Sequence, residues 1–241
     1  MKRILSTGFC AAMLFALALT AYAQEKSAAL TPKDRNGEAW WKKRFDEKVE
    51  QMKQGDIDLL LIGDSITHGW DNHEKIRDKF YADRKILNFG FSGDRTEHVL
   101  WRLENAPMDA IRPKAVTLMI GTNNIGHGSS QPKDAADGIL AIVQKLQTLY
   151  PNAKIFVLYV FPRDEKPEGN LRAKVNEINS YLPKLLADLN NVVLADIGYL
   201  FLKEDGTLPK SIMPDSLHPN DDGYTIWGDA VEPFLKPLFE K

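Results

Sequence analysis

The sequence predicts an α/β protein in which a five-stranded parallel sheet is covered by helices on both faces. From about residue 57 onward, short runs of apolar residues alternate with longer amphipathic stretches. Strands that are apolar throughout and separated by helices are typical of such a sheet. A length of 241 residues suits a single domain, and neither an internal repeat nor a linker divides this part of the chain.

The first expected helix covers residues 38–53. Aromatic and aliphatic residues recur there every three or four positions from Trp41 to Met52, which is the spacing of an amphipathic helix. We interpret this stripe as the face that packs on the core. The polar stretch 24–36 before it is expected to be a loose lead-in.

Five apolar runs have the length and composition of buried strands, and the third and fourth are rich in β-branched residues. These runs are 57–62, 85–88, 115–120, 154–160 and 192–194. Further helices are expected at 73–80, 94–105, 134–149, 170–189 and 221–238.

The first 23 residues have the organisation of a secretory signal peptide. Lys2 and Arg3 precede a mostly apolar run, and small residues flank Tyr22 just before the expected cleavage after Ala23. An N-terminal membrane anchor is the alternative, but the apolar run is short for a membrane span. The sequence therefore predicts a signal peptide (1–23), a lead-in with the first helix (24–54) and one domain (55–241). We expect an exported protein, periplasmic or extracellular, without a membrane span after cleavage.

Composition excludes several kinds of chemistry from the mature chain. The only cysteine, Cys10, lies in the predicted signal peptide, so disulfides, thiolate nucleophiles and cysteine-ligated zinc are not expected. Two of the 31 Lys and Arg residues also lie there, against 33 Asp and Glu residues in the whole chain. This acidic balance argues against nucleic acid or an anionic membrane as the main partner.

Polar residues follow the expected strands where a parallel sheet places its binding sites, beyond the carboxyl ends. Ser65 follows the first strand, Gly93 lies in the turn after the second, and Asn123 follows the third. Asp215 and His218 precede the last helix at a spacing that lets the carboxylate orient the imidazole within one turn.

Each signal has a simpler interpretation when taken alone. Ser65 has the position of a helix N-cap, the Asn123 segment resembles a polar turn, and Asp94 is expected to cap the following helix. His218 could ligate a metal with the acids at 221 and 222, although helix capping also explains those acids. The combination of all four signals is more specific than any one of them.

Together these motifs resemble those of the SGNH, or GDSL, hydrolases. The matching residues are Gly63-Asp64-Ser65, Gly93, Gly121-Thr122-Asn123-Asn124 and Asp215-Ser216-Leu217-His218. The resemblance covers about residues 55–238, and the stretch 87–103 is most similar to the catalytic subunits of platelet-activating-factor acetylhydrolase. It implies a three-layer α/β/α sandwich with a flavodoxin-like sheet. Residues 66–70 and 91–92 depart from those subunits, so the pocket wall and the substrate are not carried over.

The resemblance also implies roles for individual residues. Ser65 would be the nucleophile, His218 its base and Asp215 the carboxylate that orients the base. An oxyanion would be bound by the backbone N–H groups of Ser65 and Gly93 and by the side chain of Asn123. Three further residues are expected to contact the substrate: Asp64, Asn124 and His127. No metal and no organic cofactor are implied.

The expected activity is hydrolysis of a short-chain acyl ester, above all an acetyl ester, on a small molecule or an acetylated carbohydrate. Two alternatives stay open. One is a lipase-like enzyme that hydrolyses lipid esters, and the other is a non-catalytic carbohydrate-binding protein with the same fold. The similarity to the acetylhydrolase subunits also makes a homodimer plausible.

Overall fold

Five short apolar segments form one parallel sheet, in which the strand order is β2-β1-β3-β4-β5. The strands are β1 (Leu59–Gly63), β2 (Ile86–Gly90), β3 (Ala115–Met119), β4 (Lys154–Leu158) and β5 (Val192–Ala195). The computed structural model describes residues 27–240, so the predicted signal peptide lies outside the described residues. In this strand order, β1 and β3 flank the point where the chain changes direction across the sheet, which is where open α/β sheets bind ligands.

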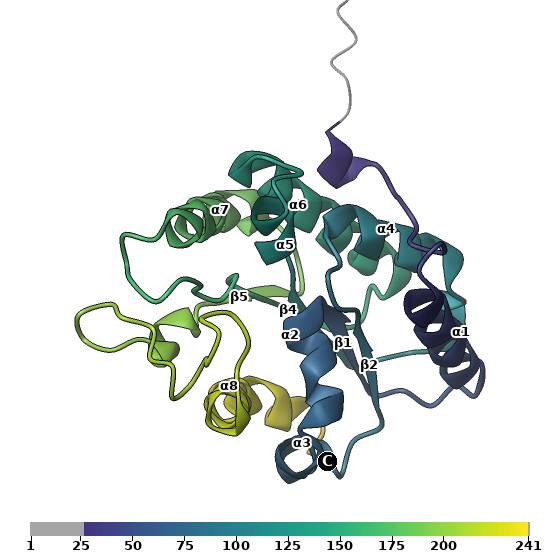
Figure 1. The fold of residues 1–241 in the computed structure, drawn as a ribbon. Helices are drawn as coiled ribbons and strands as arrows, with labels where there is room; N and C mark the ends of the chain where they lie inside the picture. Colours follow the sequence, from purple (N-terminus) through teal and green to yellow (C-terminus); the bar gives the residue numbers. More distant parts are fainter. Residues whose placement is uncertain (1–26, 241) are drawn as a thin grey trace, which may run out of the picture.

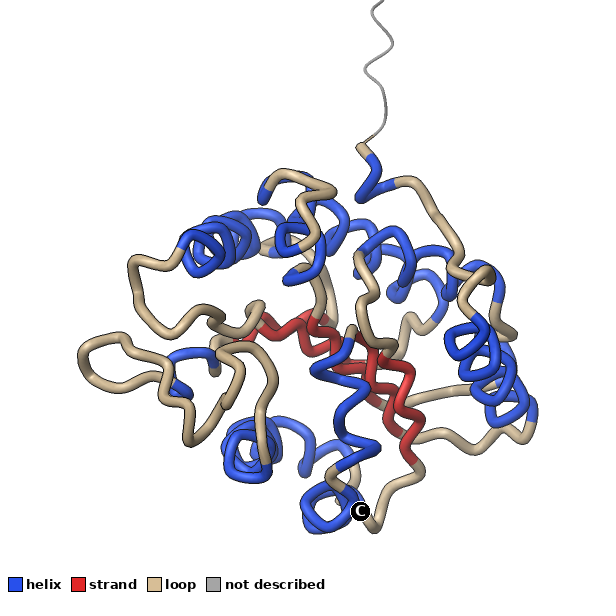
Figure 2. Tube along the Cα trace, in the orientation of Figure 1, coloured by secondary structure: helices blue, strands red, loops and turns tan. Residues whose placement is uncertain are grey.

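Helices cover both faces of the sheet, as Figures 1 and 2 show. The longer helices are α1 (Ala39–Lys53), α3 (Glu74–Tyr81), α4 (Thr96–Asn105), α6 (Pro132–Leu149), α7 (Asn170–Leu186) and α8 (Asp221–Leu235). Two short helices, α2 (Ser65–His68) and α5 (Thr122–Gly126), directly follow strand ends. Short 3-10 turns lie at Ala28–Leu30, Gly69–Asn72, Met108–Ala110, Gly198–Phe201 and Lys236–Leu238.

Alternation of side chains along the strands divides the core into two layers. On β1, Leu60 and Ile62 belong to a cluster that includes residues of α1, α4, α6 and α7. Leu59 and Leu61 belong to a second cluster that includes residues of α2, α3 and α8. Successive side chains of a strand point to opposite faces, so a strand covered on both faces is apolar at most of its positions. The expected three-layer α/β/α sandwich with a flavodoxin-like parallel sheet is confirmed.

Three sequence-based expectations need correction. The stretch 27–36 is not loose, because Ala29 is fully buried and its carbonyl accepts a hydrogen bond from Thr96 Oγ1 at 2.9 Å. The last helix ends at Leu235 and is followed by a separate 3-10 turn. The short helices α2 and α5 were not expected, because four or five residues are too few to show a helical period. Within residues 27–240, no helix is both long and apolar enough to cross a membrane.

Candidate active site

The carboxyl end of the sheet brings together side chains that are far apart in sequence. Ser65 is the first residue of α2, immediately beyond β1, and Asn123 lies in α5, beyond the neighbouring strand β3. Gly93 follows β2 on the other side of β1, and His218 lies in the loop before α8. The expected site therefore forms where three adjacent strands end.

Ser65, His218 and Asp215 form a continuous chain of hydrogen bonds. The Oγ atom of Ser65 lies 2.9 Å from Nε2 of His218. The Nδ1 atom of the same ring lies 2.6 Å from Oδ2 of Asp215. With the ring proton on Nδ1, the imidazole donates to the carboxylate and its Nε2 is free to accept the serine proton.

The turn that holds Asp215 and His218 is closed by hydrogen bonds to its own backbone. Oδ1 of Asp215 accepts the N–H groups of Leu217 at 3.0 Å and His218 at 2.7 Å. Ser216, between them, has a left-handed backbone with φ of 59°. Burial by itself would raise the pKa of Asp215, but the hydrogen bonds from His218 and Leu217 lower this pKa below its ordinary value. The carboxylate is thereby held ionised beside the ring.

Asp64 determines where Ser65 sits. Its Oδ1 accepts the N–H of Ile66 at 3.0 Å, which caps α2 and makes Ser65 the first residue of that helix. The side chain is fully buried, and its Oδ2 has no hydrogen-bond partner among the described residues. Burial raises the pKa of Asp64 to about 7. Because its side chain is fully buried, Asp64 is not exposed to a substrate, contrary to the expectation from sequence.

A backbone turn and the short helix α5 present the other expected oxyanion ligands. Gly93 has φ of +75°, a conformation that residues with a Cβ rarely adopt, and its N–H has no backbone partner among the described residues. The side chain of Asn123 is largely buried and donates one N–H to the carbonyl of Asp94 at 3.0 Å. Its second amide hydrogen remains available. The Asn123 bond thus fixes α5 to the turn that holds Gly93.

The Asp94 carboxylate anchors this turn in the protein interior. It is fully buried and accepts hydrogen bonds from Arg35 at 2.9 Å, Trp41 at 2.8 Å and Arg102 at 2.9 Å. The expected capping role is wrong, because Arg95 is the N-cap of α4 and Asp94 points instead to these three donors. Local patterns do not show this role, since two of the three donors, Arg35 and Trp41, lie more than 50 residues away in sequence.

The other two predicted substrate contacts have different environments. Asn124 is fully buried and binds Thr96, accepting from its backbone N–H at 3.1 Å and donating to its Oγ1 at 3.0 Å. It fixes α5 to α4 and cannot reach a ligand, so that prediction is wrong. His127 is exposed at the end of α5 and lines a recess of about 380 Å³ together with Gly93. Partial desolvation of the ring by its neighbours and the positive charge of Arg95 lower the pKa of His127.

The remaining histidines are engaged elsewhere. Nδ1 of His68 lies 2.9 Å from the hydroxyl of Ser92, and burial lowers the pKa of His68 to about 4. His98 accepts the backbone N–H of Arg95 at the start of α4. Asp221, which the metal alternative would pair with His218, forms its contact with His73 instead.

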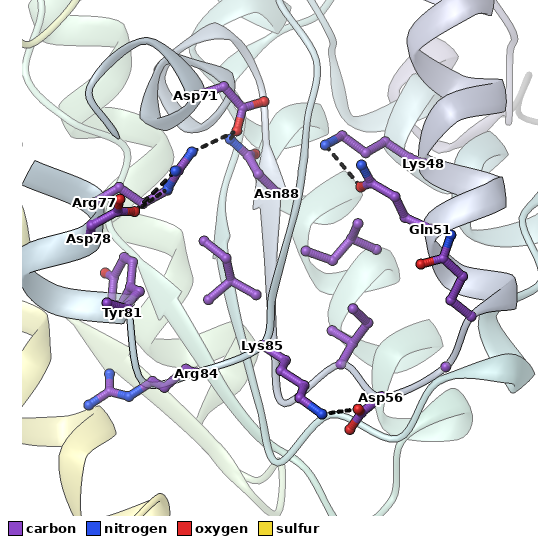
Figure 3. Close-up of a pocket in the computed structure, with 16 residues that line it drawn as sticks. Lys48, Gln51, Asp56, Asp71, Arg77, Asp78, Tyr81, Arg84, Lys85 and Asn88 are labelled. Atoms are coloured by element: carbon purple, nitrogen blue, oxygen red, sulfur yellow. Dashed lines mark hydrogen bonds and ion pairs between the residues drawn. The ribbon is translucent and has the colours of Figure 1, made fainter. Parts of the chain in front are cut away.

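A separate hollow of about 620 Å³ follows the free edge of β2, between α1 and α3. Figure 3 shows its polar and charged side chains, among them Asn88 and Lys48. None of the predicted site residues lines it. Next to it, Arg44 donates to the carbonyls of Asn88 and Gly90 at 3.3 and 2.8 Å. These hydrogen bonds cover the carboxyl-terminal part of the free edge of β2.

Comparison with known proteins gives the family. A model of the GDSL-like lipase/acylhydrolase family matches residues 61–226. The chain is 38% identical over 208 residues to platelet-activating factor acetylhydrolase IB subunit alpha2 of Homo sapiens, which covers 86% of this chain and 89% of that protein. It is 37% identical over 207 residues to the alpha2 subunit of Gallus gallus, and the match covers 86% of this chain and 85% of that protein.

Solved structures share the same fold. A GDSL-like lipase from Bacteroides thetaiotaomicron aligns with a TM-score of 0.66 at 17% identity, over 82% of this chain and 98% of that one. An acetylxylan esterase from Geobacillus stearothermophilus aligns with a TM-score of 0.59 at 17% identity, over 78% and 96%. With the family match and the curated relatives, the sheet and its strand-end motifs identify this chain as a carboxylic ester hydrolase of the GDSL-like lipase/acylhydrolase family.

Proposed function

We propose that the protein is an exported serine esterase that hydrolyses short-chain acyl esters, above all acetyl esters, through Ser65, His218 and Asp215. The observation that carries the proposal is the hydrogen-bond chain from the Ser65 hydroxyl through His218 to Asp215, with distances of 2.9 and 2.6 Å. Such a chain supplies a nucleophile, a base within reach of its proton and a carboxylate that fixes the base.

In the proposed reaction, Oγ of Ser65 attacks the ester carbonyl while Nε2 of His218 accepts the hydroxyl proton. Asp215 stabilises the resulting imidazolium. The carbonyl oxygen becomes an anion, which accepts hydrogen bonds from the N–H groups of Ser65 and Gly93 and from the Asn123 amide. The tetrahedral intermediate expels the alcohol, which takes its proton from His218. A water molecule, deprotonated by His218, then attacks the acyl-serine and releases the carboxylic acid.

The proposed acyl group is acetyl, because the curated relatives at 36–38% identity are named acetylhydrolases. The proposed alcohol is a carbohydrate hydroxyl, since an exported enzyme meets acetylated glycans outside the cytoplasm. A lipid ester is the competing substrate class. Hydrolysis rates for acetyl, butyryl and octanoyl esters of p-nitrophenol separate the two, because a lipid-hydrolysing enzyme would prefer the octanoyl ester.

The central test is turnover of p-nitrophenyl acetate by the wild type and by Ser65→Ala. We expect kcat to fall by about four orders of magnitude or more in the variant, since the nucleophile is removed. Thermal unfolding of the variant checks that it is folded. Equal activity of the two proteins would contradict the proposed serine mechanism. No activity in either would favour the non-catalytic carbohydrate-binding alternative.

Export and dimerisation belong to the same proposal. Export rests on the signal-like residues 1–23. Mass spectrometry of the secreted protein would identify an N-terminus at Gln24, whereas an intact Met1 would contradict cleavage. Sedimentation analysis would detect a homodimer, which is proposed from the similarity to the acetylhydrolase subunits.

A further inference from the structure

The proposed oxyanion donors lie on three separate elements. Ser65 belongs to α2, Gly93 to the turn after β2 and Asn123 to α5. Their N–H groups can bind one oxygen atom only if the three elements keep fixed relative positions. Asn123 connects α5 to the turn, because its amide donates to the carbonyl of Asp94 at 3.0 Å. A second connection is needed between the turn and α2, which carries the proposed nucleophile.

His68, the last residue of α2, makes this connection. Its Nδ1 lies 2.9 Å from Oγ of Ser92 and accepts the backbone N–H of Ser92 at 3.3 Å. Within residues 27–240, no other residue of α2 forms a hydrogen bond with residues 91–94. A Cβ on Gly90 would lie only 2.5 Å from the backbone nitrogen of His68. The missing side chain at position 90 therefore lets the end of α2 pack directly against the end of β2.

Residues 91–94 form a turn whose central peptide carries the Gly93 N–H. The N–H of Asp94 donates to the carbonyl of Phe91 at 3.1 Å, so Ser92 and Gly93 are the two central residues. The φ of +75° at Gly93 is typical of a type II turn. Type I and type II turns differ in the orientation of the central peptide. The direction of the Gly93 N–H therefore depends on how Ser92 is held.

Two side chains from different elements hold Ser92. Nη1 of Arg35 donates to its carbonyl at 2.7 Å. Because the carbonyl and the following N–H of a trans peptide point in opposite directions, this bond directs the Gly93 N–H away from Arg35. His68 binds the N–H and the hydroxyl of the same serine. The turn therefore cannot shift relative to α2 without breaking the bonds to His68.

The protonation state of His68 suits an acceptor. A backbone N–H can only donate, so Nδ1 carries no proton and the ring proton is on Nε2. Burial and then the positive charge of Arg44 lower the pKa of His68 to about 4, which keeps the ring neutral at neutral pH. Both members of the pair lie in the stretches 66–70 and 91–92, where this chain departs from the acetylhydrolase subunits.

We propose that His68 is a positioning residue, whose Nδ1 holds Ser92 so that the Gly93 N–H points at the oxyanion formed on Ser65. This inference rests on the proposed esterase function and adds the contact that aligns two of its oxyanion donors. The competing explanation is that the ring of His68 only packs, since it stacks on Trp40 with a centroid distance of 6.4 Å. In that case Nδ1 would be dispensable.

Two substitutions separate these explanations. His68→Phe keeps a ring beside Trp40 but removes Nδ1, whereas His68→Asn removes the ring but keeps an acceptor oxygen near the position of Nδ1. We expect kcat/KM for p-nitrophenyl acetate to fall about tenfold or more in His68→Phe, short of the roughly 100- to 1,000-fold loss for a deleted oxyanion donor. His68→Asn should retain most of the activity. Thermal unfolding checks that both variants are folded.

Inhibitors measure the oxyanion directly. With 1,1,1-trifluoroacetone, Oγ of Ser65 bonds to the ketone carbon, the ketone oxygen becomes the anion and His218 takes the serine proton. 4-Nitroacetanilide, the amide analogue of the substrate, measures binding of the ground state. His68→Phe should raise Ki for the ketone by the factor by which kcat/KM falls, and change Ki for the amide by less than about threefold.

A double-mutant cycle tests whether His68 acts through Ser92. Ser92→Ala removes the hydroxyl contact and keeps the backbone N–H, so it should lower kcat/KM severalfold in the wild-type background. In the His68→Phe background the same substitution should have no effect, because the contact is already lost.

The proposal is overturned if His68→Phe is as active as the wild type, if His68→Asn loses as much activity as His68→Phe, or if the two losses in the cycle are additive. A loss of amide binding equal to the loss of ketone binding would also overturn it. Failure of the esterase proposal itself would be seen separately, because Ser65→Ala would then hydrolyse p-nitrophenyl acetate as fast as the wild type.

Discussion

Asp64 is a fully buried carboxyl group one residue before the proposed nucleophile. It has a capping acceptor role through Oδ1, and its Oδ2 has no partner among the described residues. Burial penalises the ionised form, which raises the pKa of Asp64 from 3.8 to about 7. The unfolded chain would ionise at the ordinary value, so the folded protein binds one more proton between these two pKa values.

Stability should therefore fall as the pH rises from about 4 to about 7, by about 1.4 kcal/mol per pH unit from this group. Below the lower pKa both states are protonated, and above the higher pKa both are ionised, so the contribution is level there. Asp64→Asn keeps the capping acceptor and removes the titration. Urea unfolding measures the free energy of unfolding of both proteins at pH 5 and pH 8. We expect the difference, Asp64→Asn minus wild type, to be more positive at pH 8 than at pH 5. A difference independent of pH would contradict this.

The loop before α8 is the element that delivers the base. Asn220 is the N-cap of α8, where its side chain accepts the N–H of Gly223 at 3.1 Å and donates to the carbonyl of Ser211 at 2.7 Å. The same residue thus ties both ends of the loop that contains Asp215 and His218. The helix cap and the position of the proposed base depend on one side chain.

We expect Asn220→Ala to lower the free energy of unfolding by about 1 kcal/mol through loss of the cap. The variant should also lower kcat for p-nitrophenyl acetate, because the loop loses its tie to Ser211. Chemical denaturation and steady-state kinetics measure the two effects. Asp229→Ala, on the exposed side of α8, is the control and should change stability by less than about 0.5 kcal/mol. Equal stability of the Asn220 and Asp229 variants would argue against the capping role.

At the scale of the whole molecule, the segment before α1 packs against α4 and the turn that contains Gly93. The carbonyl of Ala29 accepts from Thr96, and the N–H of Lys33 donates to the carbonyl of Glu97 at 3.1 Å. Arg35 then binds both Asp94 and the carbonyl of Ser92, at 2.9 and 2.7 Å. The segment therefore supports the turn that presents Gly93.

A chain that begins at residue 38 should be less stable than one that begins at residue 24 by about 3 kcal/mol, because a buried ion pair to Asp94 is lost. Guanidinium chloride unfolding measures the difference. Arg35→Met in the longer chain should reproduce most of the loss, which would assign it to the ion pair. If the two chains unfold at the same denaturant concentration, the segment has no such role.

Local sequence patterns were sufficient for the elements that bury continuous apolar surface. The runs of Leu, Ile and Val predicted all five strands, and residues around Phe45 predicted α1, because periodicity is a property of neighbouring residues. The spacing of Asp215 and His218 likewise placed an acid beside its imidazole, since one turn connects them.

Other features depended on contacts between distant residues, which no local pattern contains. Two of the three donors to Asp94 come from residues 35 and 41, more than 50 positions away in sequence, and the expected capping role of Asp94 is wrong. Burial, known only from packing, removed Asp64 and Asn124 from the expected substrate contacts. The sequence by itself determined the parallel α/β fold and the residues at its strand ends. Only the tertiary structure decided which of those residues face the site, because exposure and hydrogen-bond partners are set by how the layers pack.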